Sequence, residues 1–225
     1  MIPNPTPDST VPQVTLTKAH GLGNDFLIAL EADNPGMELG PEHAIRWCDR
    51  HLGIGADGLL IGALPRTDAD DRTAATAGRS GGTSRVDLVM TLFNADGSRA
   101  EISGNGIRCL AQAALRSSGR RDGEIRIATA AGVRTLRAEA THDRDTDVLT
   151  VEMGPVGEGP LLGPAALAVG AAAIGSVSMG NPHVVIAVAD QETLDRADLA
   201  ARRRDLQGDP RWYERAHRCR GRWER

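Results

Sequence analysis

The stretch NADGSRAEISGNGIRC, residues 94–109, combines the features of a strand end, a tight turn and a small-residue loop that enters a helix. Ser103 stands where a helix N-cap belongs, and the glycines on both sides of Asn105 would let the first-turn N–H groups approach a ligand closely. Those unpaired N–H groups and the positive end of the helix suit a carboxylate. A helix that is merely capped by a serine is the alternative interpretation.

Short strands with two helices between them are predicted on both sides of this stretch. Residues 14–30 indicate two strands joined by a Gly-Asn turn. Helices are expected at residues 41–52, which begin with proline, and at residues 104–119, which end at a glycine. Apolar runs predict further strands at residues 55–64, 86–94, 124–140, 147–154 and 176–190. This order favours an α+β fold over repeating βαβ units.

The composition narrows the class of partner. The chain has 225 residues, a formal net charge of −4 and an aromatic content of 3%. No global field favours nucleic acid or an anionic membrane, and few aromatic rings are available to stack on bases. We therefore expect neither nucleic acid nor a membrane as a partner. The three cysteines, Cys48, Cys109 and Cys219, lack metal-binding spacing and cannot all pair, which favours a reducing compartment, the cytoplasm.

Four segments stand apart from the predicted elements. Residues 1–13 read as a disordered leader without the features of a signal peptide. Residues 65–85 read as a flexible loop without a function of its own. The uncharged residues 159–179 contain too much Ala and Gly for a bilayer span, and we interpret them as a covered loop plus a strand. The Arg-rich residues 191–225 form a tail, for which a solvated helix and a nucleic-acid arm are alternatives.

Glycine loops elsewhere in the chain are weaker signals. GIGADG at residues 53–58 matches a dinucleotide fingerprint, but it follows a predicted helix and precedes a strand, the reverse of the required order. GLGNDF at residues 21–26 lacks the Lys-Ser/Thr pair of a phosphate loop. Together with FNADGS and GNPH, however, GLGNDF presents one of three asparagine-bearing loops. Three amides suit a small zwitterionic ligand such as an amino acid.

The segments HGLGNDF, GIGADG, FNADGS, SGNGIRC and GNPH, in this order and spacing, resemble the diaminopimelate epimerase family over about residues 14–190. The resemblance implies interconversion of LL- and meso-diaminopimelate for lysine and peptidoglycan biosynthesis, with neither pyridoxal phosphate nor a metal. It also implies a two-lobed α+β fold. Each lobe would be a curled, mostly antiparallel β-sheet around a central helix, with the site in the cleft between the lobes.

The resemblance assigns roles to particular residues. It implies that the substrate is bound by Asn24, Asn94, Gly104, Asn105 and Asn181. In the family a thiol abstracts or returns the α-proton, and Ser103 occupies its position here, with His183 as its tuning partner. An alcohol is a much weaker acid than a thiol.

Two other residues of this region bear on the same site. Cys109 lies more than a helical turn from position 103, so we expect it to be a small buried hydrophobe and no substitute base. Gly58 stands where many members have a glutamine, so one side-chain contact to the substrate is absent.

The chain departs from the family after residue 190. Nothing there resembles the E-R-G and A-C-G-T-G segments that carry the second catalytic cysteine, and we interpret the Arg-rich ending as a frameshift or truncation. Residues 14–121 would form the first lobe, residues 122–190 an incomplete second lobe, and residues 191–225 a non-homologous tail. A related isomerase or racemase and a non-catalytic remnant or binding module stay open as alternatives, as does a homodimer.

Overall fold

The computed structural model describes residues 13–66, 85–159, 173–187 and 189–192. The predicted leader, most of the predicted flexible loop, residues 160–172 of the uncharged stretch and the Arg-rich tail beyond residue 192 lie outside these ranges. No helix within the ranges is long and apolar enough to cross a membrane.

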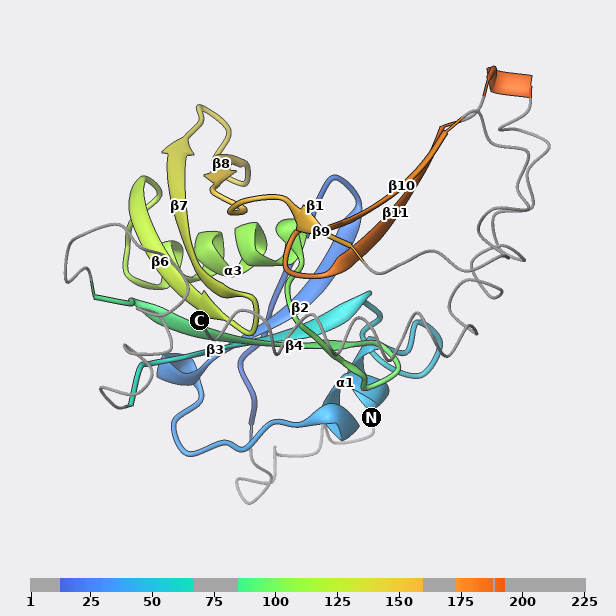
Figure 1. Cartoon of the computed structure of the whole chain (residues 1–225). Coiled ribbons are helices and arrows are strands. Elements are labelled where there is room, and N and C mark those ends of the chain that lie inside the picture. Colours follow the sequence, from blue (N-terminus) through green and yellow to red (C-terminus); the bar gives the residue numbers. More distant parts are fainter. Residues whose placement is uncertain (1–12, 67–84, 160–172, 188, 193–225) are drawn as a thin grey trace.

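An eight-stranded sheet carries most of the described chain and curls around one long helix (Figure 1). The strands lie in the order β1-β2-β3-β4-β6-β7-β8, and β5 pairs with β4. Neighbouring strands are antiparallel except in the pairs β2–β3 and β4–β6. The bounds are β1 (Thr17–Gly21), β2 (Asn24–Leu30), β3 (Gly58–Ala63), β4 (Leu88–Asn94), β5 (Arg99–Ala100), β6 (Gly123–Thr129), β7 (Gly132–Ala140) and β8 (Asp147–Val151).

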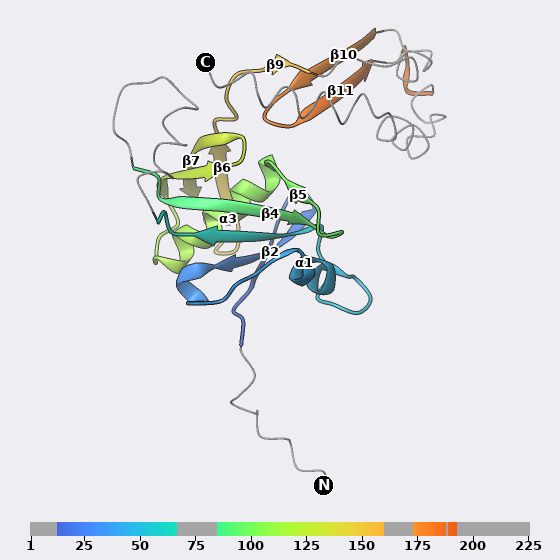
Figure 2. The ribbon, with the colours of Figure 1, turned by 60° about the horizontal axis from the view of Figure 1, so that its bottom comes forward.

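A separate three-stranded sheet, visible at the top of Figure 2, follows in the chain. It consists of β9 (Gly157–Glu158), β10 (Ala173–Ser178) and β11 (Pro182–Ala187), in the order β11-β10-β9. The large sheet continues past residue 121, where a lobe boundary was expected, because β6 pairs with β4 and β8 ends at Val151. The division of the chain into lobes stays a prediction.

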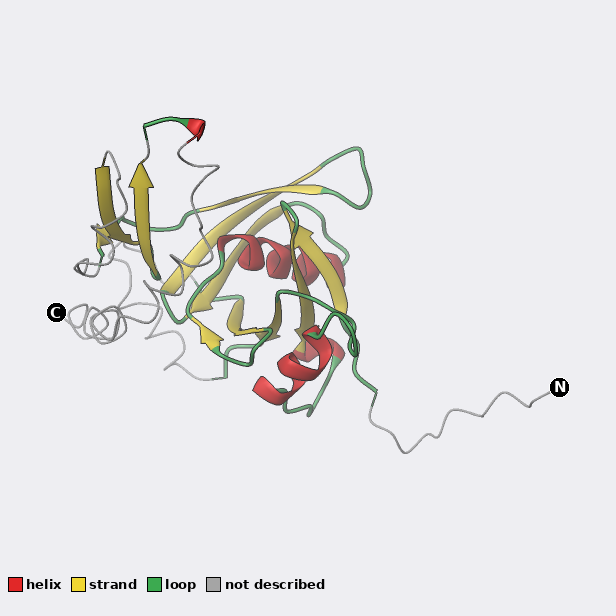
Figure 3. Cartoon of the chain, turned by 90° about the vertical axis from the view of Figure 1, so that its right-hand side faces the viewer, coloured by secondary structure: helices red, strands yellow, loops and turns green. Residues whose placement is uncertain are grey.

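The two faces of the large sheet bury different helices because side chains alternate along each strand. On the concave face, Phe26, Ile28 and Leu60 pack with Ile107 and Leu110 of α3 (Gly104–Ser117). The opposite face is covered by α1 (Pro41–Cys48), as Figure 3 shows. There the strand residues Leu27 and Leu59 pack with Ala44 and Cys48 of the helix. A short 3-10 helix, η1 (Glu31–Asp33), follows β2.

Both ends of α3 are held by specific polar contacts. At its start, the Ser103 hydroxyl accepts a hydrogen bond from the Gly106 N–H at 3.0 Å. Towards its end, Arg116 pairs with the buried carboxylate of Asp147 at 2.7 Å, and Arg121 pairs with the same carboxylate at 2.6 Å. Although burial acts to raise it, hydrogen bonds from Gln112 and these arginines hold the pKa of Asp147 below its ordinary value. The C-terminal half of the helix is thus tied to the start of β8.

Several predicted elements differ in detail from the structure. The turn between β1 and β2 consists of Leu22 and Gly23, both with positive φ, so Asn24 begins the strand and is not part of the turn. The first helix ends at Cys48, four residues before the predicted end at Leu52. Residues 124–140 and 176–190 each contain a hairpin where a continuous strand was expected. In each case a tight turn containing a glycine of positive φ interrupts the apolar pattern.

The packing of α3 predicts which apolar side chain stabilises the fold. Leu110 is 0% exposed on the concave face, whereas Leu52 is 91% exposed after α1. We expect Leu110→Ala to lower the free energy of unfolding by about 2–5 kcal/mol, because it removes apolar contacts and leaves a cavity. The control Leu52→Ala should change it by less than about 0.5 kcal/mol. Urea unfolding of both variants measures this, and equal effects would contradict the assigned core.

Candidate functional site

The N-terminus of α3 is the centre of the candidate site. Ser103 has extended backbone angles and caps the helix, so the predicted capping role is confirmed. The first turn contains Gly104 and Gly106, and a Cβ atom added at Gly106 would lie 3.3 Å from Cζ of Phe26. The helix can therefore start directly against the strand β2. Ser103, Gly104 and Asn105 all remain partly exposed, so a ligand can reach the N–H groups of this turn.

The β1–β2 hairpin lies against this helix end. A Cβ atom added at Gly21 would lie 3.2 Å from the Cβ atom of Asn105, so the strand backbone approaches the helix as closely as a side chain permits. Asn24 faces Gly21 across the hairpin and begins β2. The predicted ligand-binding residue Asn24 is thus carried by a hairpin that packs on the predicted carboxylate site.

The β10–β11 turn lies close to the same helix end. A Cβ atom added at Gly180 would lie 2.6 Å from the Cβ atom of Ala131 and 3.4 Å from Cγ2 of Ile102, the residue before Ser103. Gly180 has a φ of +96°, which an L-residue adopts only under strain. Glycine at this position therefore lets the turn, with its neighbour Asn181, pack against the β6–β7 hairpin.

Three of the four asparagines predicted to bind the substrate have a side-chain partner within the protein. Asn105 accepts a hydrogen bond from the Arg108 guanidinium. The Oδ1 atom of Asn181 lies 2.9 Å from the ring nitrogen Nε2 of His183. Asn94 donates to the hydroxyl of Ser98 at 2.9 Å. These contacts orient the amides, and a ligand would share or replace them.

His183 was expected to tune residue 103, and the structure places it on β11 with an exposed side chain. Its described partner is Asn181 rather than Ser103. Within the part of the chain that the structure describes, no hydrogen bond joins His183 to Ser103. The activation of Ser103 by His183 therefore stays a prediction.

Asn94 is linked to the β1–β2 hairpin through Asp57. The Asp57 carboxylate accepts a hydrogen bond from the Asp25 N–H at 3.0 Å, and its own N–H donates to the Asp25 carbonyl at 2.9 Å. The Asp57 carbonyl accepts from the N–H of Ala95 at 3.1 Å. One residue thus holds the backbone beside Asn24 and the backbone beside Asn94 at a fixed spacing.

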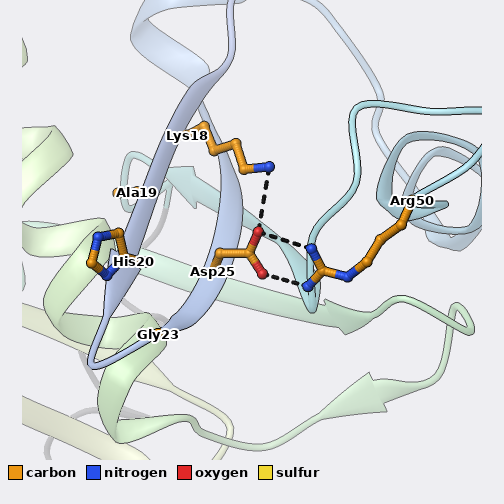
Figure 4. Close-up of a pocket in the computed structure, with 6 residues that line it drawn as sticks. All are labelled: Lys18, Ala19, His20, Gly23, Asp25 and Arg50. Carbon is orange, nitrogen blue, oxygen red and sulfur yellow. Dashed lines mark hydrogen bonds and ion pairs between the residues drawn. The ribbon is translucent and has the colours of Figure 1, made fainter.

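A charged cluster stiffens this connection (Figure 4). The Arg50 guanidinium lies 2.6 Å from Asp25 and 2.9 Å from Asp57, and the ammonium of Lys18 lies 3.3 Å from Asp25. Lys18 also donates to the carbonyl of Gly55 at 2.7 Å. Hydrogen bonds from Arg50 lower the pKa of Asp25 to about 2, and Lys18 acts in the same direction against partial burial. The cluster ties the hairpin to the loop between α1 and β3.

A cavity of about 330 Å³ borders this cluster, and it contains none of the predicted site residues. Its lining charges are paired with one another, so the cluster braces the loops and leaves no unpaired charge for a ligand. The lining residues are Lys18, Ala19, His20, Gly23, Asp25 and Arg50.

Sequence reasoning did not identify Asp25, Arg50 or Asp57 as functional. An acidic residue directly after Asn24, and another in the second glycine loop, were signals that could have suggested a shared cation.

The two described cysteines are buried, and neither thiol ionises readily enough to act as a catalytic base. Cys109 is 4% exposed within α3, and burial raises its pKa to about 11. Burial, with the nearby Asp25 charge, likewise raises the pKa of Cys48 to about 11. The prediction that Cys109 is a buried hydrophobe is confirmed. Among the residues described, no three His, Cys, Asp or Glu side chains gather in a way that could hold a metal ion.

Comparison with known proteins gives consistent relatives. A family model described as diaminopimelate epimerase matches residues 16–157. Diaminopimelate epimerase from Synechococcus elongatus is 37% identical over 198 residues, covering 81% of this chain and 62% of the relative. The protein of the same description from Synechocystis sp. is 36% identical over 195 residues, covering 83% and 64%. The chain thus spans less than two thirds of the length of these relatives.

Two solved structures share the fold of this chain. A hydroxyproline epimerase from Agrobacterium vitis aligns with a TM-score of 0.52 at 17% identity, covering 86% of this chain and 56% of that one. A probable proline racemase from Agrobacterium radiobacter K84 aligns with a TM-score of 0.56 at 15% identity, covering 87% and 57%. The predicted α+β fold, with a curled and mostly antiparallel sheet around a central helix, is confirmed.

The charged cluster predicts a pH dependence of stability. Unfolded Asp25 binds a proton near its ordinary pKa of 3.8, whereas folded Asp25 does so near 2, so its contribution is present above pH 4 and is lost as the pH falls towards 2. Asp25→Asn should therefore be less stable than the parent at pH 5, and the difference should shrink by pH 2. Urea unfolding across this range measures it. A difference that does not change with pH would contradict the role of the ion pairs.

The glycine at position 180 predicts a second effect. Gly180→Ala should displace the Asn181 turn from Ala131, because the new methyl group would clash and the backbone strain is about 1–2 kcal/mol. Gly175→Ala is the matched control, because a Cβ atom there meets nothing within 4 Å. NMR cross-peaks between residue 180 and the Ala131 methyl should vanish only in the first variant. Their survival would show that this approach does not need glycine.

Proposed function

This chain belongs to the diaminopimelate epimerase family, and we propose that it converts LL-diaminopimelate to meso-diaminopimelate, as a cofactor-independent amino-acid isomerase. The observation that supports this most directly is the convergence of two asparagine-bearing hairpins on the capped N-terminus of α3. That the reaction serves lysine and peptidoglycan biosynthesis in the cytoplasm is inferred from the family.

The α-carboxylate of the substrate would bind at the first turn of α3. Removing an α-proton leaves a carbanion, and without an electron-sink cofactor its charge must be stabilised electrostatically. The N–H groups of Gly104 and Asn105 are at the positive end of a helix of 14 residues. Because they are fixed before the reaction, they can stabilise developing charge without reorganising.

The amides of Asn24, Asn94 and Asn181 would fix the orientation of the substrate. Asn24 and Asn181 are carried by hairpins that approach α3, and Asp57 joins the backbone beside Asn94 to the backbone beside Asn24. Hydrogen bonds to a charged group contribute roughly 1.5–3 kcal/mol each, so three amides could discriminate an amino acid from a simple carboxylic acid.

Ser103 would face the α-proton, with His183 as its activating partner. A serine hydroxyl needs a strong base beside it to act at neutral pH, and the described partner of His183 is Asn181. A substrate that replaces this contact would release the imidazole. We therefore assign to Ser103 slow proton transfer, together with its capping of α3.

A non-catalytic binding module is the second candidate function. It is favoured by the serine at the catalytic position and by the raised pKa of both described cysteines, which keeps them from acting as thiolates. Such a module would bind diaminopimelate without exchanging its α-proton.

Proton exchange separates the two functions, because exchange needs only one base. We incubate the chain with LL- and meso-diaminopimelate separately in deuterated solvent and follow loss of the α-proton signal. Slow exchange is expected, and Ser103→Cys should accelerate it by about tenfold or more, because a thiolate at a helix N-terminus is the better base. Ser117→Cys, which adds a thiol at the other end of α3, is the control and should change nothing.

Three other outcomes would each assign a different role to the site. If Ser103→Ala exchanges as fast as the parent from both isomers, residue 103 is only a helix cap. If both isomers bind but neither the parent chain nor the Ser103→Cys variant exchanges the α-proton of the substrate, the chain is a binding module. If neither isomer binds, diaminopimelate is not the ligand of this chain.

A further inference from the structure

Arg134 is a buried cation on the concave face of the large sheet. It lies on β7, two residues before Leu136 and four before Ala138, and all three side chains are buried on the face that packs against α3. Its cross-strand partner on β6 is Ile127, which belongs to the apolar core around α3. Arg134 is 8% exposed. Strand alternation thus places a guanidinium in the layer that is otherwise filled by apolar side chains.

The hydrogen-bonding capacity of this guanidinium is only partly used. Nη1 donates to the carbonyl of Val133 at 2.9 Å, and Nη2 donates to the carbonyl of Ala131 at 2.9 Å. An arginine side chain has five N–H donors. Nε is buried and has no hydrogen-bond partner, and no carboxylate in the described ranges forms an ion pair with Arg134. A buried charge without an opposite charge is costly unless a partner binds.

The position of Arg134 connects it to the candidate site. A Cβ atom added at Gly154 would lie 3.6 Å from Cζ of Arg134, and one added at Gly180 would lie 3.5 Å from its Nη2 atom. Gly180 also approaches Ile102, the residue before Ser103. The guanidinium therefore lies beside the turn that carries Asn181, at the N-terminal end of α3. Other buried ions of the fold, such as Asp147, already have opposite charges.

We propose that Arg134 binds a carboxylate of the ligand at this site. The helix N-terminus takes the carboxylate at the reacting carbon, and the free donors of Arg134 take the second carboxylate of a dicarboxylic amino acid. The identity of that amino acid as diaminopimelate rests on the proposed function, whereas the carboxylate site itself rests on the unpartnered guanidinium. A monocarboxylic analogue would leave the guanidinium without its opposite charge.

A first measurement tests carboxylate binding without assuming the reaction. The probe is pimelate, a dicarboxylate of the same chain length as diaminopimelate without its amino groups. In the nitrogen-15 NMR spectrum of the chain, the Nε–H signal of Arg134 is the one that Arg134→Lys removes. We expect pimelate to shift this signal saturably, because carboxylate oxygens accept from arginine N–H groups. A signal that does not move would overturn the proposal.

A second measurement compares two ligands that differ only in the distal carboxylate. Lysine is diaminopimelate without that group. The parent should bind diaminopimelate roughly ten- to a hundredfold more tightly than lysine, as expected for one charge-assisted pair. Arg134→Gln should abolish this ratio by weakening diaminopimelate alone. Arg137→Gln, on the exposed side of the same strand, is the control and should preserve the ratio.

The outcomes separate this proposal from the proposed function. Equal weakening of both ligands in Arg134→Gln would show that Arg134 only supports the fold, even if diaminopimelate is the substrate. A pimelate-dependent shift at Arg134 without binding of diaminopimelate would support the carboxylate site and contradict the proposed function.

Discussion

Burial of α3 inside the curl of the large sheet is the interaction on which the rest of the structure depends. One face of the helix contributes Ile107, Leu110 and Leu115, which pack against apolar side chains of β2, β3, β4, β6 and β7. A sheet that bent less would leave part of this face exposed to water. The same constraint explains why β6 and β7 join the first sheet, since Ile127 and Leu136 are both fully buried in the α3 core.

Fixing α3 also fixes the charge environment at its two ends. Asp147 receives Arg116 and Arg121 near the C-terminal half, where cations complement the helix dipole. At the other end Ser103 satisfies the N–H of Gly106 and leaves the remaining first-turn donors for a ligand. The site is therefore a consequence of how the core packs: the helix cannot move without disturbing the apolar layer around it.

Two further devices connect loops that are remote in sequence. Asp57 joins the backbone beside Asn24 to the backbone beside Asn94. Arg50 pairs with both Asp57 and Asp25, and Lys18 pairs with Asp25. Arg134 lies next to the Gly180 turn on the concave face. The first device is electrically balanced and braces the loops. The second has a positive charge without an opposite charge in the described ranges, and this is the observation on which its assignment to a ligand carboxylate rests.

The sequence by itself determined the class of fold, the capped entry to α3 and the buried role of Cys109, because these follow from local periodicity, turn chemistry and capping. The sequence also showed the resemblance to the diaminopimelate epimerase family from which the candidate site residues were inferred. Only the tertiary structure decided that β6–β8 complete the first sheet, that His183 contacts Asn181, and that Asp57 and Arg134 belong to the site region. Strand pairing, and contacts between residues such as Asp25 and Asp57, depend on which surfaces the core brings together, and local sequence carries no record of that.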